Sequence, residues 1–303
     1  MSELIREIEE SDLPQVHELV ERHIGMPIAD IARLGGMTNH SYKVTVENGE
    51  EFLVRLPGEG TEELISRSDE RKSTELACKL GIDSELLHFG DDGTKVMRFI
   101  SNPQPMSADV LKKPENLSQA ARIFHTLHSC GEDTGVRFEV FEMVELYERV
   151  IREANVEFFD DYEDVRATVM RIKSEVDADG EAPRVPCHND SLVDNWVLDD
   201  SGRLFLIDWE YSGMNEAMWD LSCLSIETDC TPENDMELLR EYYEREATPA
   251  EQRRFAAAKL YVDLLWTLWG LTRVPYDGQF MRDYAAERYE RLKANIAAYE
   301  KLA

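Results

Sequence analysis

Residues 186–220 carry several polar and acidic side chains whose types and spacing are suited to acid–base chemistry and metal binding. The pattern H-x-D-x-x-x-x-N places His188, Asp190 and Asn195 in one short segment, and Asp208 follows farther along the chain. When a γ-phosphoryl group is moved, a loop Asp accepts the proton of the attacking hydroxyl, while an Asn and a later Asp hold Mg²⁺. Carboxylate and amide oxygens are the hard ligands that Mg²⁺ prefers. The spacing therefore predicts Asp190 as the base and Asn195 and Asp208 as metal ligands.

A predicted β-hairpin brings the two metal ligands together. Residues 196–198 and 204–207 are short apolar runs, and the turn formers at 199–202 separate them. Pairing of the two runs places Asn195 and Asp208 at the same end of the hairpin. The alternative is an ordinary hairpin with polar turn residues, because Asp and Asn are common in turns. The short pattern alone leaves both interpretations open.

A glycine-rich turn near the N-terminus is suited to phosphate. A pair of glycines ending at Gly36 precedes Thr38 and Asn39, and alternating stretches follow at 41–46 and 52–56. Backbone amides of such a turn approach phosphate oxygens without a side chain in the way, and the two polar side chains add donors. We expect two strands joined by a turn, with the phosphate-binding groups at its head.

Arg55, near the end of the second of these stretches, is a candidate partner for the α- and β-phosphates. A helical run is predicted over 61–80, and Glu70 and Glu75 within it are candidates to orient Arg55 by an ion pair. We favour Glu70. The alternative is a plain hairpin beside a solvated, charged helix.

Aromatic residues near the C-terminus are candidates for a ligand-binding box. Trp266 and Trp269 are three positions apart on a predicted helix and share one face, and Tyr284 lies in the next helical run. Paired aromatics on an apolar helix are usually core residues, which is the alternative interpretation. Rings beside a carboxylate are nevertheless the physical solution for a quaternary ammonium group, which has no N–H and is held by π faces and charge.

Several separated motifs in this order resemble the choline/ethanolamine kinases, with their bacterial choline-kinase-like relatives and, more distantly, the aminoglycoside phosphotransferases. The motifs are GGMTNHSYKV, FLVRLPGEGTEELISR, CHNDSLVDN, LIDWEYSG, DLLWTLWG and DYAAERY. The resemblance implies an α+β, bilobal, protein-kinase-like fold. Its small N-terminal nucleotide-binding lobe, residues 1–100, would contain an antiparallel sheet and one helix. The larger, mostly helical catalytic and substrate-binding lobe would comprise residues 101–303.

The resemblance also implies a choline kinase with ATP and Mg²⁺ as cofactors, and a role for each matching residue. Asp190 would be the catalytic base, and His188 is expected to brace its loop. Glu210 is expected among the substrate-binding residues, as an acceptor behind those that contact the substrate. Asn195 and Asp208 would bind Mg²⁺. The remaining assignments are the Arg55–Glu70 nucleotide clamp, the adenine hinge with Phe99 and Ile100, and the choline box of Trp266, Trp269, Tyr284 and Glu227.

The catalytic loop departs from the family pattern in a way that leaves the acceptor open. Ser191, Val193 and Asp194 stand where close bacterial relatives are expected to have a larger apolar residue, proline and glutamate. The alternatives are therefore ethanolamine, thiamine or an aminoglycoside as the acceptor. A catalytically silent protein that binds choline or a nucleotide is a further alternative, although intact Asp190, Asn195 and Asp208 together count against it.

The composition fits this interpretation. The 303-residue chain has a formal net charge of −29, which disfavours nucleic acid and anionic membranes and favours a cationic small-molecule substrate. No apolar run reaches the length of a bilayer span. The five cysteines form no C-x-x-C pair, which predicts a reducing cytoplasm and neither a zinc site nor a disulfide framework. The oligomeric state is not predicted.

The lobe boundary is expected at residues 101–105, where two prolines end the last strand of the N-terminal lobe. The chain beyond it is predicted to be mostly helical. Helices are expected over 114–128, 136–154, 160–176, 232–247, 250–272 and 283–299.

Overall fold

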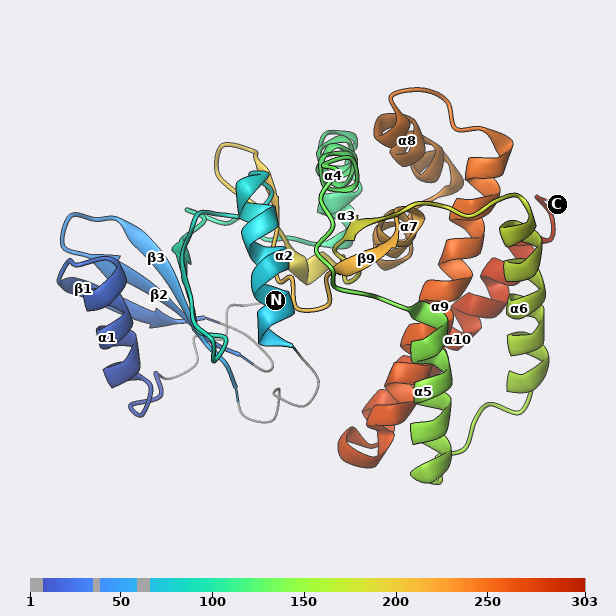
Figure 1. Cartoon of the computed structure of the whole chain (residues 1–303), viewed down its shortest axis with the longest axis horizontal. Helices are drawn as coiled ribbons and strands as arrows, with labels where there is room; N and C mark the ends of the chain where they lie inside the picture. The colour runs from blue at the N-terminus through green and yellow to red at the C-terminus, as the bar shows by residue number, and fades with distance from the viewer. Residues whose placement is uncertain (1–7, 35–38, 59–65, 303) are drawn as a thin grey trace. The chain divides into compact units, whose positions relative to one another are not determined.

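The structure is a computed structural model that describes residues 8–34, 39–58 and 66–302 (Figure 1). The chain divides into two compact units. The first comprises Met1–Ser107 and Asp194–Ser212, and the second comprises Ala108–Val193 and Gly213–Ala303. The hairpin that follows the proposed catalytic loop thus groups with the N-terminal unit. The functional division at residue 100 into a nucleotide-binding and a catalytic lobe stays a prediction.

Among the described residues, the first unit contains an antiparallel five-stranded sheet in the order β1-β2-β3-β5-β4, helices α1 and α2, and a separate hairpin of β7 and β8. The bounds are α1 Leu13–His23, β1 Ile28–Arg33, β2 His40–Val46, β3 Glu51–Leu56, α2 Arg67–Lys79, β4 Leu86–Phe89, β5 Lys95–Arg98, β7 Trp196–Leu198 and β8 Leu204–Leu206.

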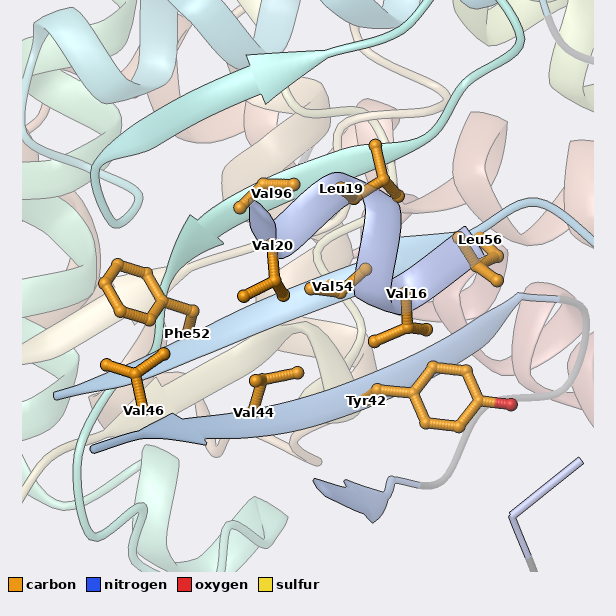
Figure 2. Close-up of a cluster of buried hydrophobic side chains, with 10 residues drawn as sticks. All are labelled: Val16, Leu19, Val20, Tyr42, Val44, Val46, Phe52, Val54, Leu56 and Val96. Atoms are coloured by element: carbon orange, nitrogen blue, oxygen red, sulfur yellow. The ribbon is translucent and has the colours of Figure 1, made fainter. Parts of the chain in front are cut away.

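The core of the first unit lies between α1 and one face of the sheet (Figure 2). Alternate residues of β2 and β3 point to this face, as the two-residue period of a strand requires. Helix α1 covers them with residues spaced three and four apart. The buried set is Val16, Leu19, Val20, Tyr42, Val44, Val46, Phe52, Val54, Leu56 and Val96.

The second unit is mainly helical, with one short antiparallel strand pair, β6 with β9, among its described residues. The bounds are α3 Ala108–Leu111, α4 Pro114–His128, α5 Val140–Glu153, α6 Tyr162–Ala178, β6 Arg184–Cys187, β9 Gly213–Glu216, α7 Met218–Glu227, α8 Pro232–Tyr243, α9 Pro249–Asp277 and α10 Gln279–Tyr299. A single 3₁₀ turn, Val193–Asn195, joins β6 to the hairpin of the first unit.

Helix α9 is the central element of the second unit and packs against α5, α6, α7 and α10 (Figure 1). It begins with a capping box, in which Thr248 and Glu251 each accept the other's backbone N–H, and with Pro249 in its first turn. Because several helices surround it, α9 carries buried residues on more than one side. It runs to Asp277, beyond the predicted end at 272, and includes Pro275 in its last turn.

The antiparallel sheet and the mainly helical second unit confirm the predicted α+β class. Helix α1 adds to the one helix expected in the N-terminal lobe, and α2 begins at Arg67 within the predicted run 61–80. Within the described ranges, no helix is long and apolar enough to cross a membrane.

Candidate active site

The loop that carries Asp190 follows directly from strand β6 and is tied to helix α7 by Asp220. The backbone N–H groups of His188 and Asn189 donate to the two carboxylate oxygens of Asp220 at 2.8 and 2.7 Å. His128 Nε2 lies 3.0 Å from the same carboxylate. Asp220 is completely buried. A buried carboxylate that accepts backbone N–H groups fixes the path of the chain, because leaving either donor unpaired would be costly.

Asn189 supports the sharp turn before Asp190. Its φ of 68° lies in the left-handed region, which Asn tolerates better than most residues. Its carbonyl accepts the Trp219 indole N–H at 2.9 Å, and its side-chain oxygen accepts from Asn215 at 3.0 Å. These contacts hold the strained residue in place, so the position of Asp190 is set by the second unit's core.

Asp190 itself is half-buried, and its own loop orders its backbone. The Asp190 N–H donates to His188 Nδ1 at 3.3 Å, and His188 is completely buried. Ser191 is also buried and donates its hydroxyl to the Asp220 carbonyl at 3.2 Å. His188 thus contacts the loop that it is predicted to brace, and the buried Ser191 ties the same loop to α7. The bracing role of His188 stays a prediction.

The hairpin of the first unit brings Asn195 and Asp208 to one end, as its pairing predicts. Trp196 pairs with Leu206 in antiparallel register, and the Ile207 N–H donates to the Asn195 carbonyl at 2.9 Å. Asp208 directly follows this pair with a φ of 67°. Asn195 and Asp208 therefore lie together at the open end of the hairpin, opposite its turn.

A buried charge network surrounds Glu70 on α2. Its Oε1 pairs with Arg55 of β3 and lies 2.7 Å from Lys95 Nζ of β5, while its Oε2 lies 2.8 Å from Arg67 Nη1. Arg55 also donates to Asp208 Oδ1 at 3.1 Å. The expected Arg55–Glu70 ion pair is thus present, and Arg55 links it to the hairpin.

Opposite charges keep Glu70 ionised despite its burial. Burial alone would raise the pKa of Glu70, but the charges of Lys95 and Arg55, with their hydrogen bonds, lower it to about 2. Burial lowers the pKa of Lys95, the Arg55 charge adds to that effect, and Glu70 opposes it. The charged states of Glu70 and Lys95 are therefore stabilised by the opposite charges beside them.

The carboxylates beside the hairpin fit a divalent cation. One oxygen from each of Glu70, Asp208 and Glu210 lies within 4.8 Å of the others. Glu70 is engaged by cationic side chains, but the buried Glu210 Oε2 has no hydrogen-bond partner among the described residues. Burial and the Asp208 charge raise the pKa of Glu210 to about 7. A cation would relieve this repulsion, and the oxygen donors of Asn195 and Asp208 suit Mg²⁺.

The other residues predicted to contact the nucleotide are placed in part. Gly36 and Thr38 lie outside the described residues. Asn39 is buried, and its Oδ1 has no hydrogen-bond partner within the described ranges. Phe99 follows β5, donates its N–H to the Glu51 carbonyl at 3.1 Å, and is half-buried, as is Ile100.

The three predicted aromatic residues form a continuous cluster in the second unit. The Trp266 and Trp269 rings meet edge to face with centroids 5.8 Å apart, and Trp269 meets Tyr284 in the same way at 5.7 Å. Trp266 is 5% exposed, whereas Trp269 and Tyr284 are half-buried. Trp266 therefore serves in part as core, and the other two rings keep surface that a ligand can contact.

Glu227, at the end of α7, is linked to this cluster through Arg288, which contacts both Glu227 and the Tyr284 ring. Its role as a substrate-binding residue stays a prediction. Burial raises the pKa of the Tyr284 hydroxyl against the opposing charge of Arg288. The carboxylates of Glu227 and Asp190 add to this rise, so both lie within electrostatic range of the hydroxyl. Within the second unit, Tyr284 is thus the member of the aromatic cluster that both Glu227 and the predicted base Asp190 influence electrostatically.

Comparison with known proteins identifies the family. The sequence profile of the choline/ethanolamine kinases matches residues 31–264. The chain belongs to the choline/ethanolamine kinase family. It is similar to the solved structure of a choline/ethanolamine kinase family protein from Mesorhizobium loti, at 33% identity and a TM-score of 0.82, covering 95% of this chain and 98% of that one.

Two further relatives represent both acceptors of the family. The chain is similar to choline kinase LicA from Streptococcus pneumoniae, at 29% identity and a TM-score of 0.78, covering 96% of this chain and 100% of that one. It is 26% identical to ethanolamine kinase 2 of Mus musculus, covering 88% of this chain and 76% of that protein. The family resemblance and the protein-kinase-like fold are confirmed, and the protein is an ATP-dependent phosphotransferase.

Sequence reasoning missed several residues that matter in this kinase-family site. Asp220 is a buried charge in the mainly apolar α7 sequence MWDLSCLSIE, and a charge in such a setting was the available signal. Lys95 is a buried charge in the short strand β5, KVMR, where a second charge, Arg98, weakens that signal. Arg288, which contacts both Tyr284 and Glu227, gave no comparable signal because its helix α10 is rich in charged residues.

Proposed function

We propose that this kinase transfers the γ-phosphoryl group of ATP to the hydroxyl of choline, giving phosphocholine and ADP. The observation that carries the proposal is the continuous cluster of Trp266, Trp269 and Tyr284, whose last member lies within electrostatic range of Asp190. A quaternary ammonium group has no N–H donors, so π faces and a nearby carboxylate are what recognise it. Each well-placed ring contributes about 0.5–2 kcal/mol.

Asp190 would act on the acceptor hydroxyl. A half-buried carboxylate on a loop with a fixed backbone is suited to orient the hydroxyl and to accept its proton as the new P–O bond forms. Asp220 and Asn189 hold that loop without contacting the reacting atoms. Their part in the reaction is positional.

Residues of the first unit would hold ATP. Arg55 is suited to pair with the phosphates because Lys95 and Arg67 continue to neutralise Glu70 when Arg55 turns away from it. Asn39 offers a buried side-chain amide at the end of the glycine-rich segment. Phe99 and Ile100 directly follow strand β5, and they are assigned to the hinge that would contact adenine.

Asn195 and Asp208 would hold Mg²⁺, with Glu210 nearby as a further oxygen donor. The metal supplies charge neutralisation on the phosphate oxygens. Arg55 lies beside Asp208 as a neighbouring positive charge. The unsatisfied buried oxygen of Glu210 supports the assignment.

The acceptor is tested by measuring ADP release with Mg·ATP and choline, ethanolamine, thiamine or kanamycin. A kcat/KM for choline at least tenfold above each of the others supports the proposal. Preference for ethanolamine would keep the chemistry and reject the choline assignment, and preference for kanamycin would reject the compact aromatic site.

A variant of Trp269 tests the recognition mechanism. Trp269→Leu should raise KM for choline by about 2- to 30-fold, the range of one cation–π contact, and should affect ethanolamine less because a primary ammonium group retains its hydrogen bonds. Equal losses for both amines would argue against recognition by the rings. Phe280→Leu, at a residue 70% exposed on the same pair of helices, is the matched control and should change neither KM.

A further inference from the structure

Arg288 of α10 occupies the place where a cation would meet the aromatic cluster. Its guanidinium carbon lies 3.6 Å from the centroid of the Tyr284 ring. Its Nη2 lies 3.2 Å from Glu227 Oε1. The side chain is buried, with only 8% of the residue exposed. Arg288 thus contacts the same ring and the same carboxylate that are assigned to the substrate's ammonium group.

The charge of Glu227 is already balanced within the protein. Arg291, one turn farther along α10, also pairs with Glu227 Oε1 at 3.1 Å and with Asp263 at 2.7 Å. No ring contact of Arg291 is found within the described residues, whereas the Arg288 guanidinium carbon lies over the Tyr284 ring. The two arginines therefore share a carboxylate but differ in their relation to the aromatic cluster.

The hydrogen bonding of Arg288 is incomplete. Its buried Nε has no hydrogen-bond partner among the described residues. A guanidinium that is stacked and ion-paired but not fully hydrogen-bonded is held less firmly than one with every donor satisfied. Another cation that displaces Arg288 therefore breaks fewer hydrogen bonds than it would if every donor of the guanidinium were paired.

We propose that Arg288 is a specificity-determining residue, a resident cation that competes with the substrate's ammonium group for the Tyr284 face and for Glu227. The inference rests on the proposed function of this site. A quaternary ammonium group depends on the ring face and must displace Arg288, whereas a primary ammonium group can share Glu227 through its N–H donors. Arg288 thereby lowers the ratio of kcat/KM for choline to kcat/KM for ethanolamine.

The test is calorimetric titration with tetramethylammonium chloride of the wild type and of the matched variants Arg288→Gln and Arg291→Gln. Both variants remove one positive charge from Glu227, but only the first uncovers Tyr284. Arg288→Gln should lower the dissociation constant about tenfold, or about 1.4 kcal/mol. Arg291→Gln should change the dissociation constant by less than about threefold, which is clearly less than the tenfold effect expected of Arg288→Gln.

Equal gains in the two variants would mean that only net charge matters, and no gain in Arg288→Gln would mean that Arg288 supports the rings. Either result overturns the proposal. If Arg288→Gln does not show a cooperative melting transition, Arg288→Lys takes its place, because it keeps the charge but loses the flat face. It should still bind tetramethylammonium several-fold more tightly, and wild-type affinity would overturn the proposal.

This binding test is independent of turnover. If the wild type releases no ADP in response to any amine, the proposed function fails, yet the affinity difference between the two glutamine variants still decides the role of Arg288. With an active enzyme, the choline-to-ethanolamine ratio of kcat/KM should also rise in Arg288→Gln.

Discussion

Replacing Asp220 with Asn tests whether this buried carboxylate positions the catalytic loop. The substitution keeps the size of the side chain but leaves one oxygen where two oxygens accept the N–H groups of His188 and Asn189. The new NH₂ group then faces a backbone donor. At least one buried N–H loses its acceptor, and the charge-assisted character of the remaining bonds is lost.

The expected cost follows from these contacts. A hydrogen bond to a charged group contributes about 1.5–3 kcal/mol, and a buried donor left unsatisfied costs about 1–3 kcal/mol. We therefore expect Asp220→Asn to lower the free energy of unfolding by roughly 3 kcal/mol. Because a displacement of about 1 Å at a reacting group costs on the order of 100-fold in rate, kcat should fall 10- to 100-fold.

The assay combines urea unfolding with steady-state ADP release at saturating amine. The KM for ATP should change by less than about threefold, since the wild-type charges around Glu70 belong to the first unit. Asp235→Asn is the matched control, because Asp235 is a carboxylate of the second unit that pairs with Lys259 and Ser225 rather than with the backbone of the loop. It should lose stability but retain kcat. Wild-type kcat in Asp220→Asn would refute the positioning role.

Three further predictions concern the first unit. Lys95→Met should raise KM for ATP at least about fivefold in steady-state kinetics, because Glu70 would then hold Arg55, the proposed phosphate-binding residue, more strongly. An unchanged KM for ATP would contradict this role of Lys95. Burial raises the pKa of Asp83 from its ordinary 3.8 to about 6, so its ionised form lowers stability above pH 6 and this cost disappears toward pH 4. Asp83→Asn should therefore raise the free energy of unfolding, measured with urea, more at pH 8 than at pH 4, and the two gains should differ by roughly 3 kcal/mol. A gain that is the same at both pH values would disprove the raised pKa. Phe52→Ala should lower the free energy of unfolding by about 3–5 kcal/mol because Phe52 is a core residue that is only 2% exposed. The control Phe280→Ala, at a residue 70% exposed, should change it by no more than about 0.5 kcal/mol. Equal urea midpoints for the two variants would contradict the core assignment.

Elements with local signals were predictable from the sequence. The hairpin at 196–206 follows from two apolar runs around a turn, and helix α4 has the predicted bounds because Pro114 fits a first turn. The Arg55–Glu70 pair was expected from the order of strand and helix, and the edge-to-face contact of Trp266 with Trp269 follows from their spacing on one helix.

What escaped prediction depends on contacts distant in sequence. Lys95 meets Glu70 because β5 pairs with β3 in the sheet, an order that sequence periodicity does not encode. Asp220 reaches the loop 31 or 32 residues before it. Arg288 covers Tyr284 one helical turn away, but its ion pair with Glu227 requires the packing of α10 near the end of α7. Such tertiary pairs are set by the fold as a whole.

The central claim is that a γ-phosphoryl group is transferred to choline with Asp190 as the base. The most direct measurement is ³¹P NMR of the products formed from Mg·ATP and choline by the wild type and by Asp190→Asn. The account predicts phosphocholine and ADP with the wild type and neither with the variant, which should still bind ATP. Formation of inorganic phosphate without phosphocholine, or undiminished phosphocholine from Asp190→Asn, would contradict it.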